Sequence, residues 1–369
     1  MAFALFLSAR GLPALLIGVV LTLALLTGAA LSWATGALVG RFGRNTTLVA
    51  AAVLMALAAA ILGIANGLTL IIIACLLGTL SAGGQEVGPF APIEQHIIVE
   101  MSSHGSATRA FALYNLAGSF AAAAGALLAG FVALAWVPWL YAACAAGLLV
   151  TYALLAAKQP TEQSQSVAER LAPQKPLPSS GVGEKLAVLF GVDALAGGFV
   201  VQSFLAYWLH VHYGVDQRLL GPLFFGTNVL SGLSFLVAAW VANRIGLLRT
   251  MVFTHLPSNV LLCLVPAMPS FFWAAILLLA RFALSQMDVP TRQAFTMYAV
   301  RPDERARAAG LTNAVRPAAA AIAPIFSGIA MQAAAVALPF FLAGGLKIAY
   351  DLAMYALFSR TKLNDGQQG

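Results

Sequence analysis

The sequence predicts an all-α membrane protein that crosses the bilayer many times. Of its 369 residues, 61% are hydrophobic and only 9% are charged, whereas roughly 25% of the residues of a soluble domain are charged. Apolar runs of about 20 residues, the length that spans a bilayer, recur from one end of the chain to the other. A membrane β-barrel would instead show short segments of alternating polarity.

Eleven spanning segments are expected, five before a polar stretch and six after it. Residues 158–185 are rich in Pro, Ser and Gln, which is typical of a linker. We therefore expect an N-terminal helical bundle at 1–157 and a C-terminal bundle with a short cytoplasmic tail at 186–369. The expected segments lie at about 17–39, 48–65, 69–90, 110–132, 136–157, 186–208, 219–242, 250–267, 271–292, 308–332 and 338–359.

The basic residues predict how the chain is oriented in the membrane. Most loop lysines and arginines lie on the side of the linker, whereas Arg10 and Arg218 fall in loops on the other side. By the positive-inside rule the linker and the C-terminus are cytoplasmic, in what we expect to be a bacterial inner membrane. Topology thus explains the net charge of +7, and a nucleic-acid partner is not expected.

The two halves are expected to be repeats. Under a shift of 198 residues, five polar or small residues of the first half fall on identical residues of the second. The aligned residues are Pro92, Gln95, Arg109, Asn115 and Gly130, which fall on Pro290, Gln293, Arg307, Asn313 and Gly328. Because five segments face six, we interpret Met1–Leu7 as the last turns of a truncated first helix.

A loop motif occurs once in each half. GALVGRFGRN begins at Gly36 and AWVANRIGLLR begins at Ala239, and each puts glycine and arginine in a tight turn. Glycine permits a positive φ and a close approach of helices. The motif residues, which are our gating candidates, are Gly36, Arg41, Gly43, Arg44, Arg244 and Gly246.

These loops resemble the repeated loop signature of the major facilitator superfamily. The resemblance implies two pseudo-symmetric helical bundles and a secondary transporter that moves a small solute by alternating access. Gly40 and Asn243 stand where the family carries an acidic residue, which puts the family's charge relay in doubt. GGQEVGPFAPIEQ and LSQMDVPTRQ are similar to an uncharacterised bacterial branch, and the family's antiporter signature is absent.

Charged residues fall on the segments that line the cavity in this family. On that mapping the lining segments include 69–90, 186–208 and 271–292. A charge at the bilayer centre costs about 2.5–3.5 kcal/mol on insertion scales, so a charge placed there needs a partner or a role. The candidates for solute contact or proton coupling are Glu86, Asp193, Gln202, Arg281 and Asp288.

Arg281 begins a stripe of polar residues along one helix face. Ser285, Asp288 and Arg292 follow it at spacings that keep them on that face. Arg281 either binds an anionic group of the solute or neutralises Asp288. Arg292 aligns with Glu94 under the shift of 198, so the two are gating candidates expected to meet when the inner mouth closes. Alternatively, Arg292 reaches the lipid headgroups and Glu94 is solvated.

Asp193 has no basic residue near it in the sequence. Burial of a carboxyl group without a partner favours its protonated form, which suits a group that takes up and releases protons. Glu86 is the second candidate for this role, and a hydrogen-bonded structural Asp193 is the alternative. Lys347 and Asp351 are spaced i, i+4 on the last helix and are expected to pair with each other or with an acid elsewhere.

Together these features predict a monomeric secondary transporter, with proton-coupled export of a small organic compound as the working hypothesis. Its expected partners are a small solute, protons and the lipid bilayer. The alternative is a non-transporting membrane receptor, scaffold or degenerate remnant. Because the sequence shows neither a Walker loop, a nucleophile triad nor a metal-ligand cluster, we expect no enzyme activity, no cofactor and no metal.

Overall fold

A computed structural model describes residues 1–83, 90–101, 107–158, 181–301 and 304–360. Secondary structure in these residues is helical throughout, without strands. Among these described residues, ten helices are long and apolar enough to cross a membrane by their length and composition. The predicted fold class, an all-α polytopic membrane protein, is confirmed.

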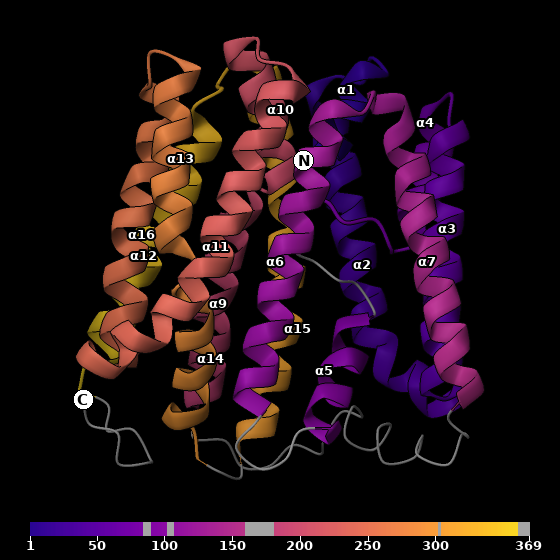
Figure 1. Ribbon diagram of the computed structural model, residues 1–369. Coiled ribbons are helices and arrows are strands. Elements are labelled where there is room, and N and C mark those ends of the chain that lie inside the picture. Colours follow the sequence, from indigo (N-terminus) through magenta and orange to yellow (C-terminus); the bar gives the residue numbers. More distant parts are fainter. Residues whose placement is uncertain (84–89, 102–106, 159–180, 302–303, 361–369) are drawn as a thin grey trace.

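In the described residues before the linker there are seven α-helices. They run up and down between two ends of the molecule, which we call the linker end, lower in Figure 1, and the distal end, upper in Figure 1. A short 3-10 helix, η1 (Leu134–Trp136), leads into the last of them. The helices are α1 (Ala2–Ala9), α2 (Ala14–Phe42), α3 (Arg44–Ile64), α4 (Leu68–Leu76), α5 (Phe90–Met101), α6 (Ala107–Phe131) and α7 (Val137–Lys158).

In the part of the second half that the structure describes there are eight α-helices, with a 3-10 turn, η3 (Val265–Ala267), between two of them. In Figure 1 most of them form a group beside the helices of the first half, and α6 stands next to this group. They are α9 (Val182–Gly198), α10 (Gln202–Tyr213), α11 (Gln217–Ile245), α12 (Leu247–Leu264), α13 (Phe271–Ser285), α14 (Asp288–Ala299), α15 (Arg305–Gln332) and α16 (Leu338–Phe358).

One predicted segment, 69–90, does not form a continuous helix, so that prediction is wrong. Helix α4 ends at Leu76, and Gly78 adopts a φ of +70°. A Cβ atom added to Gly78 would lie 2.9 Å from the carbonyl oxygen of Thr27, so the chain at this point fits closely against α2. The Thr27 hydroxyl also donates to the Cys75 carbonyl at 2.7 Å. Glu86 lies outside the described residues.

Two spans of the second half are interrupted near their middle. The break between α9 and α10 leaves the Phe199 carbonyl without a helical partner, and the Ser327 hydroxyl of α15 donates to it at 2.8 Å. The second break lies between Ser285 of α13 and Asp288 of α14. Both breaks put helix ends, with their unpaired backbone groups, inside the part of the molecule that carries the buried charges.

The loop motif has the same geometry in both halves. Gly43 ends α2 with φ 82° and ψ 159°, and Gly246 ends α11 with φ 86° and ψ 160°. Four residues later, the hydroxyls of Thr47 and Thr250 donate to the carbonyls of these glycines, each at 2.8 Å. The positive φ explains why glycine stands at both positions.

Glycines also bring the two halves together near the distal end. A Cβ added to Gly18 of α2 would lie 2.5 Å from the Pro324 carbonyl oxygen of α15. A Cβ added to Gly221 of α11 would lie 2.7 Å from the Cα atom of Gly130 of α6. Gly130 and its shifted counterpart Gly328 are both in such crossings, so the α2–α15 and α6–α11 contacts are equivalent under the repeat.

Hydrogen bonds between the halves flank these crossings. The Gln332 side chain accepts from the Leu15 amide at 3.2 Å, and the Gln217 side chain donates to the Val132 carbonyl at 2.9 Å. The Thr22 hydroxyl accepts from the Ile325 amide at 3.0 Å. The distal end is therefore a place of close, hydrogen-bonded packing between the first and second halves.

Candidate functional site

Asp193 of α9 is the centre of a buried charged cluster in the second half. Its side chain is 3% exposed and receives hydrogen bonds from Lys347 Nζ at 2.5 Å and Arg316 Nη1 at 3.0 Å. Arg292 Nη1 lies 3.6 Å from the same carboxylate. Three cations from α14, α15 and α16 thus surround one carboxylate, as a buried charge requires.

A second layer of polar groups lies behind Asp193. His255 Nε2 is 3.9 Å from Asp193 Oδ1, and His255 Nδ1 is 2.8 Å from Asp351 Oδ1. The Asn259 amide donates to the other oxygen of Asp351 at 2.9 Å. Asp351 is fully buried, and this network ties α12 to α16 and α9.

Asp288 and Arg292 form an ion pair within α14. The pair joins the cluster because Arg292 also approaches Asp193. Counted formally, the carboxylates of Asp193, Asp288 and Asp351 balance the cations Lys347, Arg292 and Arg316.

Arg281 of α13 adds a cation that this balance does not need. Its side chain is 8% exposed, its Nε is buried without a hydrogen-bond partner, and its guanidinium lies 4.8 Å from the ring centre of Phe282. Ser285, one turn further along α13, also has a buried hydroxyl without a partner. A buried guanidinium with a free donor is a ready site for an anionic group.

The residues of the predicted stripe from Arg281 to Arg292 are all directed to the protein interior, although a break between α13 and α14 falls within the stripe. Arg281, Ser285, Asp288 and Arg292 are all buried. The side chains therefore face the interior of the second half rather than lipid. Arg292 contacts Asp288 and Asp193 in this structure, so its partners here are neither Glu94 nor lipid headgroups.

The first half holds a much smaller polar centre. Glu94 of α5 accepts hydrogen bonds from the hydroxyls of Tyr114 at 2.6 Å and Tyr152 at 2.5 Å. Glu94 and Arg292 thus have separate partners in this structure. Their expected meeting concerns another state of the molecule, and it stays a prediction.

The other gating candidates lie at the linker end. Arg41 stands over the ring of Phe42 at 5.3 Å and Arg244 over the ring of Trp240 at 4.3 Å. Both arginines are exposed, which fits residues that anchor the loops to a membrane surface. Gly36 lies within α2 and Arg44 begins α3.

Gln202, a candidate for solute contact, begins α10 beside the break between α9 and α10.

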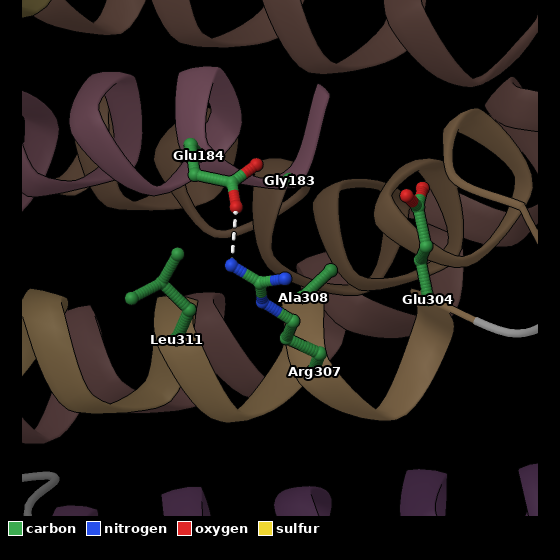
Figure 2. Close-up of a pocket in the computed structure, with 6 residues that line it drawn as sticks. All are labelled: Gly183, Glu184, Glu304, Arg307, Ala308 and Leu311. Carbon is green, nitrogen blue, oxygen red and sulfur yellow. Dashed lines mark hydrogen bonds and ion pairs between the residues drawn. The ribbon is translucent and has the colours of Figure 1, made fainter. Parts of the chain in front are cut away.

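Two pockets lie outside the charged cluster. A pocket of about 10 Å³ at the linker end is lined by Glu184 and Arg307, whose side chains pair at 2.8 Å between α9 and α15 (Figure 2). That volume suits at most a water molecule. A larger, open pocket of about 540 Å³ lies at the distal end, where Leu134 of the first half faces Gln217 of the second.

The structure corrects two expectations about charge. Asp193 was predicted to lack a basic partner because none is near it in the sequence, but Lys347, Arg316 and Arg292 come to it from other helices. Lys347 and Asp351 do not form the expected i, i+4 pair. Lys347 instead takes the alternative partner, a distant acid, and Asp351 binds His255.

Sequence reasoning missed His255, Asn259 and the role of Arg316. His255 and Asn259 lie four residues apart on a segment that looked only apolar. Their i, i+4 spacing was the available signal, because it puts two polar groups on one helix face. Within the part of the chain that the structure describes, no group of three or more His, Cys, Asp or Glu residues is arranged to hold a metal ion.

Comparisons with known proteins agree with this architecture. The model of the Major Facilitator Superfamily matches residues 1–324. An uncharacterized membrane protein of Saccharomyces cerevisiae is 26% identical over 359 residues, which cover 86% of this chain and 80% of the yeast protein.

Among solved structures, the D-xylose-proton symporter matches with a TM-score of 0.73 at 14% identity, over 99% of this chain and 93% of that one. The nucleoside transporter NupG matches with a TM-score of 0.71 at 13% identity, over 97% and 94%. The human organic anion transporter MFSD10 matches with a TM-score of 0.68 at 17% identity, over 95% and 87%. At these identities the likeness concerns the fold alone.

Proposed function

Because the chain belongs to the major facilitator superfamily, we propose that it is a secondary transporter that moves a small organic anion by alternating access. Residues 1–157 and 186–369 would be the two moving bundles, with the linker and C-terminus in the cytoplasm. The equivalent glycine crossings support a state that is closed at the distal end. A protein of this family is an integral membrane protein and a transporter rather than an enzyme.

The observation that carries the substrate class is the surplus cation Arg281. The other six charges of the cluster cancel, while Arg281 keeps a buried donor without a partner. A carboxylate or phosphate group of the solute would satisfy this donor and neutralise the surplus charge. Without solute, the buried charge of Arg281 destabilises the protein. A bound anion neutralises this charge, and in this way a buried cation favours the binding of an anion over an uncharged solute.

We further propose that solute movement is coupled to protons. A cluster that holds several carboxylates, arginines and a histidine at the middle of the span is typical of proton-linked transport. Export, the direction expected from the sequence, stays a prediction. It is tested by imposing a proton gradient of either sign across the proteoliposome membrane and measuring which sign drives accumulation of the solute.

The test is uptake into proteoliposomes that contain the purified protein. Labelled monocarboxylates, dicarboxylates and sugar phosphates are compared with uncharged sugars and nucleosides. We expect uptake of at least one anion, and a loss of about tenfold or more in Arg281→Gln, which corresponds to about 1.4 kcal/mol.

The matched control is Arg218→Gln, because Arg218 is exposed at the distal end and should be replaceable. Transport of an uncharged solute that Arg281→Gln leaves unchanged would contradict the proposed substrate class. Correct folding of each variant is checked by size-exclusion chromatography and thermal unfolding.

A further inference from the structure

His255 lies between two carboxylates in the interior of the second half. Its Nδ1 is 2.8 Å from Asp351 Oδ1, and its Nε2 is 3.9 Å from Asp193 Oδ1. A neutral imidazole has a hydrogen on one nitrogen only, so one lone pair would face a carboxylate oxygen. A protonated imidazole would direct an N–H group toward each carboxylate. The geometry therefore suits a histidine that gains and loses a proton.

Asp193 is poorly suited to hold the transported proton itself. Lys347 and Arg316 donate to it, and Arg292 lies within 3.6 Å of it. Adding a proton to this carboxylate would leave three cations facing a neutral acid, and opposite charges at such distances favour the ionised form. Asp193 is better placed to hold these cations together.

Asp351 has different surroundings, although it is on the same helix as Lys347. Among the described residues, its carboxylate binds His255 and Asn259, and neither a lysine nor an arginine takes part. Its partner is thus the one side chain type whose charge ordinarily changes between about pH 5 and pH 8. Both groups are buried, at 0% and 3% exposure, so a proton bound there is shielded from solvent.

The other groups around His255 have fixed roles in the same cluster. The Tyr350 ring packs edge-on against the imidazole, with centroids 6.1 Å apart. The charged groups around the pair are Asp193 on α9, Arg281 on α13, Asp288 and Arg292 on α14, Arg316 on α15 and Lys347 on α16. Within this set Lys347 and Arg316 bind Asp193, and Arg292 binds Asp288. Asp351 is the carboxylate of the cluster whose partner is the histidine.

We infer that the His255–Asp351 pair is the proton-binding site of the transporter. This rests on the proposed function for its coupling to solute, but not for the binding of the proton. A proton from water adds to the free nitrogen lone pair of the imidazole, forming an imidazolium ion held by both carboxylates, and release reverses this step. Of the side chains that contact Asp193, Arg316 is the most exposed, at 26%.

The site can be tested without knowing the solute. The chain has five histidines, so replacing His96, His104, His210 and His212 with Gln leaves His255 alone. In nanodiscs, ¹⁵N-histidine NMR of this variant should show one ring that changes from neutral to protonated as the pH is lowered from about 9 to about 5. Adding Asp351→Asn should change the midpoint by about one pH unit or more.

A His255 ring that stays in one charge state over this range would overturn the inference. So would a midpoint that Asp351→Asn leaves unchanged. The Asn substitution keeps the size of the side chain and one of the two acceptor oxygens that face α12, so this second measurement does not require an emptied core.

The coupling is tested separately in proteoliposomes, with the anion found to be transported. Asp351→Asn and His255→Gln should lose proton-driven accumulation but keep exchange of labelled for unlabelled anion, since exchange needs no net proton transfer. His212→Gln, which changes an exposed histidine, should keep both. Unchanged accumulation, or equal loss of both activities, would overturn the inference. Absence of anion transport in the unmodified protein would instead contradict the proposed function.

Discussion

The two halves of the molecule have the same glycine turns between helices but differ in the charged groups that they enclose. Gly43 and Gly246 have nearly identical backbone angles, and each accepts a hydrogen bond from the threonine four residues later. Among the residues that the structure describes, the first half encloses the carboxylate of Glu94 between two tyrosine hydroxyls. In the described part of the second half, seven charged side chains and a histidine gather in one cluster, and of these only Arg316 is not buried.

This difference indicates that the repeated and the unrepeated features of the two halves serve different functions. The features that repeat, the glycine turns and the glycine crossings, concern how helices approach and move. The features that do not repeat concern charge. Tyr152 of the first half even aligns with Tyr350 of the second under the shift of 198, but Tyr152 donates to a glutamate and Tyr350 packs against His255. We therefore expect the second half to hold the chemistry and both halves to supply the motion.

The largest effect is expected from breaking the charged cluster at its centre. Asp193→Asn leaves Lys347 and Arg316 without their carboxylate, and removing one partner of a buried ion pair costs about 3–5 kcal/mol. Thermal unfolding in detergent should show a markedly less stable protein. Asp216→Asn is the control, because Asp216 is an exposed cap of α11 and Asn is an equally favourable cap, so stability should change little. Equal losses of stability in the two variants would show that the ion pairs of Asp193 do not stabilise the fold.

The glycine crossings should come next. Gly221→Ala and Gly328→Ala each put a methyl group within 2.7 Å of backbone atoms of the other half, and overpacking of this kind costs about 1–3 kcal/mol. We expect similar losses of stability and transport in both, because the crossings are equivalent.

The control for these variants is Gly125→Ala, on the same helix as Gly130, where an added Cβ meets nothing within 4 Å. If only one of the two crossings were sensitive, the halves would not be equivalent at the distal end.

A smaller effect is expected in the polar centre of the first half. Tyr152→Phe and Tyr114→Phe each remove one hydrogen bond to Glu94, and a hydrogen bond to a charged group contributes about 1.5 kcal/mol or more. Unfolding should show this loss, with Tyr355→Phe as the exposed control. Proton-driven accumulation should be kept, since the chemistry lies in the other half. A specific loss of coupling would move the proton site to the first half.

The smallest effect is expected at the two glycine turns, which end α2 and α11. Thr47→Val and Thr250→Val each remove a hydroxyl that donates to a glycine carbonyl while keeping the branched shape. Each should cost about 0.5–1 kcal/mol. The informative result is the difference between the two variants in their loss of unfolding free energy, which should be close to zero if the two glycine turns are equivalent.

Much of the fold could be predicted from the sequence, because in a membrane each span must satisfy its backbone hydrogen bonds as a helix. Residue type at a fixed spacing also located the turns at Gly43 and Gly246 and the buried stripe of α13 and α14. The break near Gly78 was missed, because a glycine within an apolar run shows its positive φ only against a neighbouring helix, here α2.

The site was less predictable because its partners are far apart in the sequence. Asp193 and Lys347 are separated by 154 residues, and His255 and Asp351 by 96. Periodicity assigns a side chain to a helix face but does not say which helix packs there. An isolated acid such as Asp193 therefore looked unpaired, and His255 was not recognised at all.

Alternating access itself is tested most directly by distances between the halves in nanodiscs. With Cys75, Cys144 and Cys263 replaced by Ser, one spin-labelled pair is placed at Trp136 and Leu219 of the distal end and another at Phe42 and Ile245 of the linker end. All four positions are exposed. Pulsed electron paramagnetic resonance then reads both distances as the pH and the anion are varied. Alternating access predicts two populations at each end, with the distal distance lengthening as the linker-end distance shortens. A single distance at each end, unchanged by anion or pH, would contradict it.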